Sequence, residues 1–262
     1  MTDPTHADGA SPTPIDRAAP TQEPDSPVLM HQNWHHLLFL HWEVPPQELQ
    51  ALLPHGLDLD TFDGKAYVGL VPFTISGVRP SFVPPLPLIS SFHEVNVRTY
   101  VHRGGKDPGV WFFSLDASSA LAVTAARAMY KLPYFDAAMT FAASEEPLPT
   151  IELTAQRTDP RGTKPAHGRV IYKPADGVVS YAQLGTLEFF LLERYILYSA
   201  DDRHNLYRAR VHHQPYPIER AEVMELDETL VWAAGIKRGE EVPIRHYAKE
   251  VNVKVYALER AS

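Results

Sequence analysis

Apolar and polar residues alternate along many short stretches of this chain, and this period of two is typical of β-strands. The clearest stretch is 92–101 (FHEVNVRTYV), in which valine and threonine separate a glutamate, an asparagine, an arginine and a tyrosine. Further strands are predicted at 34–43, 65–75, 110–115, 134–142, 150–157, 169–173, 206–213 and 251–258. Turn signals such as Asp63-Gly64 and Gly104-Gly105 separate some of these strands.

Three segments carry helix signals instead. The segment 45–54 (PPQELQALLP) has one proline where a first turn tolerates it and another where the helix must stop. A second helix is predicted to begin at Ser118 or Ser119 and to run to residue 130, and the third is 186–195 (TLEFFLLERY). Because helices and strands do not alternate regularly, we predict a β-rich α+β fold, an antiparallel barrel or sandwich with two or three short flanking helices.

The first 27 residues differ in composition from the rest of the chain. They are rich in Pro, Asp, Thr and Ala and lack aromatic residues. Such a segment buries too little apolar surface to offset the entropy lost on ordering, so we predict a disordered tail at 1–27 and a single domain at 28–262. The proline-rich stretch 79–88 (RPSFVPPLPL) is predicted to be a loop that folds over another part of the domain.

Composition and charge narrow the functional classes. The chain has 262 residues, a formal net charge of −8 and no cysteine. The basic residues are scattered, which argues against a nucleic-acid or anionic-membrane partner, and the missing thiols exclude disulfides and thiolate chemistry. The apolar runs are shorter than the roughly 20 residues of a membrane-spanning helix, and no signal peptide precedes them. We therefore predict a cytoplasmic protein without a membrane partner. The sequence does not decide whether it forms homo-oligomers.

The chain contains 13 histidines, which raises the question of a metal site. On the first predicted strand, His35 and His41 point to the face opposite His36, and no spacing such as HExxH occurs. Signatures of nucleotide binding and of serine hydrolases are also missing from the sequence. We predict neither a metal nor a cofactor.

The strand 92–101 places Glu94, Asn96, Arg98 and Tyr100 on one face. The alternation alone permits two interpretations. This face either is wetted by solvent, as in many antiparallel sheets, or lines the interior of a barrel. In the second case an acid, an amide, a guanidinium and a phenol in one row suit a small polar ligand. The pKa of a buried glutamate would then depend strongly on its surroundings.

Two helix ends supply further polar candidates. The segment 125–135 (AARAMYKLPYF) contains Arg127, Lys131 and Tyr134. Lys131 either complements the dipole at the helix end or acts as an amine nucleophile, which would require burial. In 188–195 (EFFLLERY), Glu193 and Arg194 form either an exposed ion pair or an inward-facing pair beside Glu94 and Arg98.

Several long motifs, in this order, resemble those of YqjF-like bacterial proteins, a domain-of-unknown-function family grouped with acetoacetate decarboxylase. They are FLHWEVPP, LLPHGLDLDTFDGKAYVGLVPF, FHEVNVRTYV, GVWFFSLDASSALAVTAAR, KLPY and LLERYILY, and the resemblance covers residues 33–258. It implies the acetoacetate decarboxylase-like fold, a cone-shaped antiparallel β-barrel with a polar interior pocket. It also favours an inward orientation of Glu94 and Arg98.

The same resemblance bears on the reaction. Acetoacetate decarboxylase forms a Schiff base on a lysine in a Pro-Lys-Lys motif after a helix, whereas the equivalent place here is Pro133-Tyr134-Phe135. Because both lysines are missing, and because Lys131 precedes the proline, we predict no Schiff-base decarboxylase. Fold alone does not establish a function.

Three hypotheses follow. In the first, the barrel binds a small carbonyl or carboxylate compound and is a lyase-type enzyme without a Schiff base. Its catalytic candidates are Glu94 and Tyr134, and its ligand-binding candidates are Asn96, Arg98, Tyr100, Arg127, Glu193 and Arg194. Glu94 would be the acid or base, Arg98 or Arg127 would hold a carboxylate, and Tyr134 or Tyr100 would donate to a carbonyl oxygen.

The second hypothesis is a non-catalytic ligand binder or sensor. It predicts the same pocket with internally satisfied ion pairs and no strongly shifted pKa. The third is purely structural. It pairs Glu94 with Arg98 and Glu193 with Arg194, and it predicts a closed interior without a ligand-sized cavity.

Overall fold

The computed structural model describes residues 15–81, 91–144 and 148–261, and within them it contains a 13-stranded sheet and four α-helices. The strands are β1 (Met30–Val44), β2 (Asp58–Leu59), β3 (Ala66–Pro80), β4 (Ser91–Arg103), β5 (Lys106–Ala117), β6 (Tyr134–Ala143), β7 (Ile151–Arg157), β8 (His167–Pro174), β9 (Ile196–Ala200), β10 (Leu206–His212), β11 (Ile218–Glu228), β12 (Ile244–Val255) and β13 (Glu259–Arg260). The helices are α1 (Pro46–Gln50), α2 (Ala120–Tyr130), α3 (Leu187–Leu192) and α4 (Leu230–Ala233). No helix in these ranges is long and apolar enough to cross a membrane.

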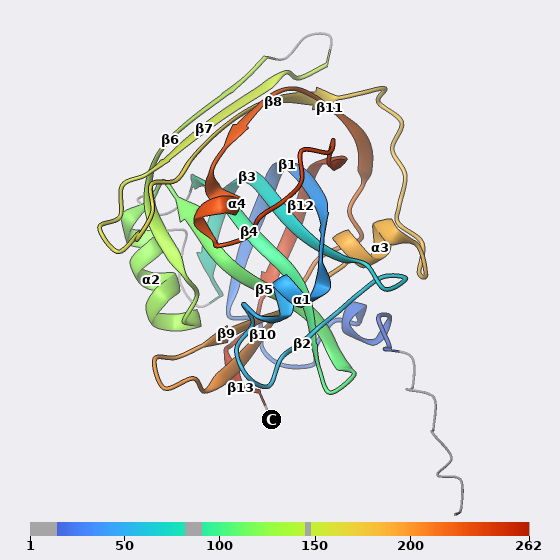
Figure 1. The fold of residues 1–262 in the computed structure, drawn as a ribbon, viewed down its shortest axis with the longest axis vertical. Helices are drawn as coiled ribbons and strands as arrows, with labels where there is room; N and C mark the ends of the chain where they lie inside the picture. The colour runs from blue at the N-terminus through green and yellow to red at the C-terminus, as the bar shows by residue number, and fades with distance from the viewer. Residues whose placement is uncertain (1–14, 82–90, 145–147, 262) are drawn as a thin grey trace, which may run out of the picture.

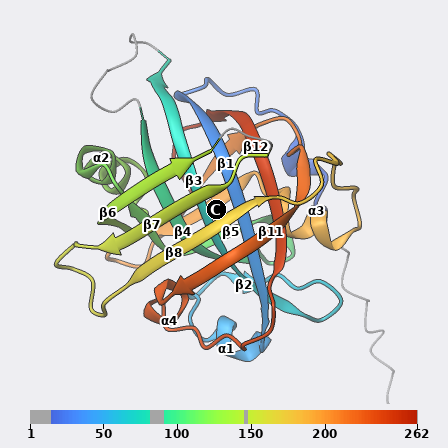
Figure 2. The same cartoon turned by 90° about the horizontal axis from the view of Figure 1, so that it is seen from above.

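The strands form two closed rings that share one wall (Figure 1). The wall consists of β12, β1, β3, β4 and β5 in this order. One ring, which we call the cavity ring, is closed by β9 and β10, and the other, the second ring, by β6, β7, β8 and β11. Figure 2 shows the strands that close the second ring lying across those of the wall.

This architecture confirms the predicted β-rich barrel fold, with two refinements. The barrel is not evenly round, and its sheet is mixed, because β5 pairs in parallel with both β6 and β9 through short contacts. The remaining strand pairs are antiparallel, including the long β1–β3 and β3–β4 ladders. Antiparallel pairing between neighbours in sequence explains why local turn signals located several of these strands.

Both faces of β4, a strand of the shared wall, are buried. Val95 and Val97 of β4 belong to a core inside the second ring, together with Ile151 and Leu153 of β7. The opposite face of β4 points into the cavity ring, and every β4 residue from 94 to 101 is buried. The interpretation of this polar face as solvent-wetted is therefore wrong.

Several elements begin or end differently from the sequence prediction. The strand β11 (IERAEVMELDE), the short β9, the helix α4 and the first half of β12 were not predicted. Most positions of β11 are exposed or half-buried, so its sequence lacks the apolar alternation of a core strand. The predicted cap of α2 is present, because the side chain of Ser119 accepts a hydrogen bond from the backbone of Ala122.

The N-terminal segment is ordered further upstream than predicted. Residues 15–27 lie against the rings, whereas 1–14 lie outside the described residues. Pro20 is buried in a 3₁₀ turn, and the guanidinium of Arg210 donates to the carbonyls of Pro20 and Gln22 at 2.7 Å each. Lys254 donates to Glu23 at 2.6 Å. The prediction of disorder through residue 27 is wrong for this half of the segment, because backbone carbonyls and scattered side chains anchor it without an apolar core of its own.

The predicted proline-rich loop is only partly covered by the structure. Strand β3 continues to Pro80, beyond the predicted end at residue 75, and pairs there with Met30 of β1. Residues 82–90 lie outside the described residues, so the rest of the loop prediction stays a prediction.

Candidate ligand-binding cavity

A cavity of about 270 Å³ lies inside the cavity ring. Small-molecule sites typically measure roughly 300–1,000 Å³, so this is a small one. Most of its walls are apolar side chains from β1, β3, β5 and α2. The charged and amide groups that line it are Gln32, Glu94, Asn96, Arg98 and Arg194, and its tyrosines are Tyr130, Tyr134 and Tyr216.

Glu94 and Tyr134 form one polar group of this cavity. Tyr134, at the start of β6, donates its hydroxyl to Oε2 of Glu94 at 2.8 Å. The amide nitrogen of Asn96 lies 3.4 Å from Oε1 of the same carboxyl group. Burial raises the pKa of Glu94 to about 7, although both hydrogen bonds oppose this shift. The carboxyl group can therefore both hold and release a proton near neutral pH.

The partners of this carboxyl group are both donors, which suits its ionised form. Burial and the adjacent Glu94 raise the pKa of Tyr134 well above its usual value, so the phenol stays a donor. The side-chain oxygen of Asn96 has no hydrogen-bond partner among the described residues. A half-turn of this amide would bring its oxygen to a protonated Oε1 of Glu94.

Arg98 is a buried cation without a carboxylate partner. It is 8% exposed, and no carboxylate oxygen of the described residues lies within 4 Å of its guanidinium. One nitrogen donates to the backbone carbonyl of Leu191 at 3.1 Å, while Nε has no partner in the described part of the chain. The guanidinium carbon lies 5.6 Å from the ring centre of Phe39 and 5.8 Å from that of Tyr100. An uncompensated buried charge is unfavourable, and an anionic ligand would relieve it.

A second guanidinium, Arg194, also lines the cavity. It donates to Oδ2 of Asp60 at 2.9 Å and to the carbonyl of Phe190 at 2.7 Å, but its Nη2 has no partner within the described ranges. Asp60 is shared, because Arg17 of the N-terminal segment pairs with its other oxygen. Burial lowers the pKa of Arg194, and the charge of Asp60 opposes this shift. Arg17 and Arg194 thus share one carboxylate, while Arg98 has none within 4 Å in the described residues.

Two of the predicted ligand-binding residues lie behind the cavity wall. The hydroxyl of Tyr100 donates to the carbonyl of Leu191 at 2.7 Å and lies 2.6 Å from Nε2 of His41. Glu193 accepts a hydrogen bond from Tyr195 and another from the backbone of Tyr216 at 3.0 Å. Neither residue lines the cavity.

The two ion pairs of the structural hypothesis do not form. Glu94 bonds to Tyr134, and Arg194 pairs with Asp60 and not with its sequence neighbour Glu193. The interior is also not closed, since the cavity is present. Asp60 was missed by the sequence interpretation, because nothing in the run LDLD distinguishes a buried acid from an exposed one.

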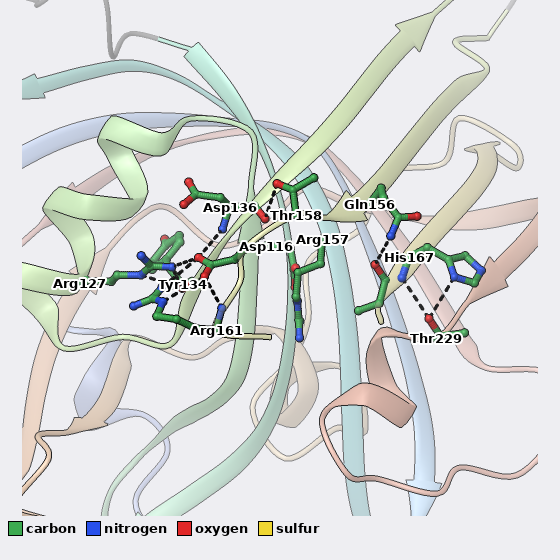
Figure 3. Close-up of polar contacts among 12 residues, drawn as sticks. Asp116, Arg127, Tyr134, Asp136, Gln156, Arg157, Thr158, Arg161, His167 and Thr229 are labelled. Carbon is green, nitrogen blue, oxygen red and sulfur yellow. Dashed lines mark hydrogen bonds and ion pairs between the residues drawn. The ribbon is translucent and has the colours of Figure 1, made fainter. Parts of the chain in front are cut away.

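Arg127 does not line the cavity and belongs to a separate cluster of charges (Figure 3). Its guanidinium pairs with Asp159 and donates to the carbonyl of Tyr134 at 2.9 Å. Arg161 reaches the same carboxylate at 3.0 Å. Arg127 is thus held by Asp159 and the carbonyl of Tyr134, and it does not contact a ligand in the cavity.

Lys131 lies at the end of α2 with a left-handed backbone (φ 54°), and its ammonium lies 5.1 Å from the ring centre of Tyr207. It does not line the cavity, and neither does any other lysine of the described residues. In the same ranges, no group of three or more His, Asp or Glu side chains is arranged to hold a metal ion.

Known proteins resemble this chain at two levels. The model of the DUF2071 family of uncharacterised conserved proteins matches residues 31–252. The uncharacterised protein YqjF of Bacillus subtilis is 38% identical over 239 residues, covering 91% of this chain and 95% of that protein.

Solved structures extend the resemblance in fold. The enduracididine biosynthesis enzyme MppR complexed with pyruvate has a TM-score of 0.61 at 12% identity and covers 97% of this chain and 99% of its own. An acetoacetate decarboxylase-like enzyme from Sphingomonas wittichii reaches 0.60 at 13% identity, covering 90% and 94%. An acetoacetate decarboxylase from Legionella pneumophila reaches 0.56 at 14%, covering 98% and 99%. At these identities the likeness establishes the acetoacetate decarboxylase-like fold, and the chain itself belongs to the DUF2071 family of uncharacterised conserved proteins.

Proposed function

We propose that the cavity binds a small carboxylate that also carries a carbonyl group, and that Glu94 and Tyr134 act on this carbonyl without a Schiff base. The observation that carries the proposal is Arg98, a guanidinium buried in the cavity wall with no carboxylate of the described chain beside it. A guanidinium recognises a carboxylate through two parallel hydrogen bonds, and burial strengthens this attraction. The fold neighbour MppR is complexed with pyruvate, a keto acid, which agrees with this ligand class.

The guanidinium groups of Arg98 and Arg194 each have a nitrogen that can still donate a hydrogen bond. Nε of Arg98 and Nη2 of Arg194 both lack partners in the described residues. Arg98 is the residue we assign to the carboxylate, because Arg194 is already paired with Asp60 and Arg127 with Asp159. Arg194 adds to the positive potential of the same end.

Glu94 is the proposed acid–base group. With a pKa raised to about 7 by burial, a large fraction of Glu94 is ionised at neutral pH. The carboxylate would take a proton from the carbon next to the ligand carbonyl and return it, while a hydrogen bond from Tyr134 would stabilise the oxygen that gains charge. Proton transfer of this kind needs no lysine, in keeping with a cavity lining that contains none.

A passive binder would have a different interior. That alternative predicts satisfied ion pairs and ordinary pKa values, whereas Arg98 has no carboxylate partner in the described residues and burial raises the pKa of Glu94. Both features favour the acid–base version. Perturbed carboxyl groups in clefts are characteristic of catalytic sites.

Binding is tested first, with wild type, Arg98→Met and Lys131→Met in a thermal-shift and calorimetry panel of keto acids from pyruvate to 7-oxooctanoate. Lys131→Met is the matched control, because it removes a cation near the site that does not line the cavity. A ligand at 100 times its Kd stabilises the protein by about 2.7 kcal/mol. We expect Arg98→Met to weaken binding at least about tenfold, or about 1.4 kcal/mol, and Lys131→Met to leave it unchanged.

Two results would contradict the binding proposal: keto acids that bind Arg98→Met as tightly as wild type, or keto acids that bind neither protein. The chemistry is tested separately by NMR. Wild type should exchange the hydrogens next to the ligand carbonyl for deuterium from solvent, and Glu94→Gln should not. Exchange that continues in the variant would remove Glu94 from the proposal.

A further inference from the structure

We propose that the cavity selects an elongated keto acid, in which several methylenes separate the carboxylate from the carbonyl, and not a short one such as pyruvate. This inference rests on the proposed function and concerns the distance between its two polar ends. It follows from the positions of the groups along one strand.

Glu94 and Arg98 stand four positions apart on the same face of β4. A strand advances about 3.3 Å per residue, so their Cα atoms are separated by about 13 Å. No nitrogen of Arg98 lies within 4 Å of a carboxylate oxygen in the described residues. Side chains on a strand stand roughly perpendicular to the sheet, so the guanidinium and the carboxyl group should be separated by a similar distance, which a ligand must span to reach both.

The two groups are held by different partners. The guanidinium of Arg98 lies beside the rings of Phe39 and Tyr100 and donates to the carbonyl of Leu191. The carboxyl group of Glu94 is held by Tyr134, and the charged residue that acts on its pKa is Asp116. The two polar ends thus remain apart.

The wall between the two ends is largely apolar. At the midpoint stands Asn96, and the residues paired with it across the neighbouring strands are Val71 and Leu115. Both line the cavity, as do Phe39 and Phe73. This middle section can pack against the methylene groups of a ligand, and its polar side chain is the Asn96 amide.

Burial increases from one end to the other. At one end, which we call the open end of the described lining, Met129 is 49% exposed and Met30 and Pro80 are half-buried, whereas Phe39 beside Arg98 is fully buried. Glu94 is nearer the open end than Arg98 is, because Phe92, two positions before Glu94, pairs with Ile75 at that end. The ligand would therefore enter with its carboxylate first and place its carbonyl beside Glu94.

The length of the ligand follows from these positions. Hydrogen bonds of about 3 Å at each end leave roughly 7 Å for the ligand. A zigzag carbon chain advances about 1.25 Å per bond, so the carboxylate and keto carbons should be five or six bonds apart. The compounds 6-oxoheptanoate and 7-oxooctanoate meet this requirement, and pyruvate, with one bond, does not.

The test is a calorimetric series of methyl keto acids from pyruvate to 7-oxooctanoate, each beside the plain fatty acid of equal length. Every methylene that enters the cavity should tighten binding roughly threefold to fourfold, up to the matched length. At that length the keto acid should bind at least about tenfold more tightly than its plain fatty acid in wild type. In the Tyr134→Phe variant the ratio of the two affinities should fall towards one. In the Arg98→Met variant both compounds should bind more weakly, by a similar factor.

The outcomes separate the two proposals. If pyruvate or levulinate binds as tightly as 7-oxooctanoate and still depends on Arg98, the length selection is wrong and the proposed function stands. If Tyr134→Phe keeps the advantage of the keto acid, the carbonyl does not lie beside Glu94 and the inference also fails. If no acid of the series binds in an Arg98-dependent way, the proposed function fails, and the length selection fails with it.

Discussion

We predict that the substitution Glu94→Gln changes how the free energy of unfolding depends on pH. Burial raises the pKa of Glu94 from 4.5 to about 7, so in this window the folded protein holds a proton that the unfolded chain has released. Because the folded state binds more protons there, its stability falls as the pH rises from about 4.5 to about 7. The contribution of the neutral carboxyl group is complete below this window and lost above it.

The magnitude follows from the size of the shift. A displacement of about 2.5 pKa units corresponds to about 3 kcal/mol of stability, an upper figure for one group. Glutamine has the shape of the neutral acid, can accept from Tyr134 and can donate to the free oxygen of Asn96, but it does not ionise. Wild type and variant should therefore be similarly stable near pH 4.5, and the variant should be more stable by up to about 3 kcal/mol near pH 8.

Urea unfolding of both proteins at intervals between about pH 4.5 and pH 8 measures this difference directly. The same substitution at Glu43, an exposed acid paired with Lys65, controls for the loss of a surface charge. A stability difference between wild type and Glu94→Gln that does not change with pH would refute the reasoning. So would a variant that is less stable than wild type near pH 8.

Three further predictions concern the charged groups around the cavity. Asp116→Asn should destabilise the protein by about 3–5 kcal/mol in urea unfolding, because it leaves the buried Arg157 without its carboxylate; a loss below about 1 kcal/mol would contradict this. Lys131→Gly should raise stability by about 0.5 kcal/mol by relieving its left-handed backbone, while borohydride should trap no lysine adduct with a keto acid in either protein. Asp60→Asn should tighten keto-acid binding at least about tenfold by releasing Arg194, and a weaker affinity in calorimetry would contradict that role.

The sequence was sufficient to predict the features that depend on local pattern. Strand β4 and the helix α2 with its serine cap were predicted from the residues themselves, as was the common face of Glu94, Asn96 and Arg98. The side of the sheet on which that face lies could not be derived in this way. It depends on β5 pairing with β4, β6 and β9, and β9 is far away in sequence.

The partners of the charged residues show the same limit. Arg194 follows Glu193 directly, yet its carboxylate is Asp60, more than a hundred positions earlier, and Asp60 also binds Arg17 of the segment predicted to be disordered. Arg127 and Tyr134 come from one short stretch, but the last turn of α2 and the start of β6 direct them to different sides. Spacing along the chain does not determine such pairings, because they depend on how strands distant in sequence close the rings.

The shared wall gives a physical reason why a polar row can be buried in this fold. In the second ring, Val95 and Val97 pack into an apolar core that stabilises β4 from one side. The other side of the same strand is thereby free to carry an unpaired guanidinium and an open cavity, both of which lower stability. A methionine at position 98 would fill the space without a charge, so a chain under selection for stability alone would have little reason to keep Arg98. A buried cation that no carboxylate of the described residues compensates is most simply explained by a ligand that brings the opposite charge.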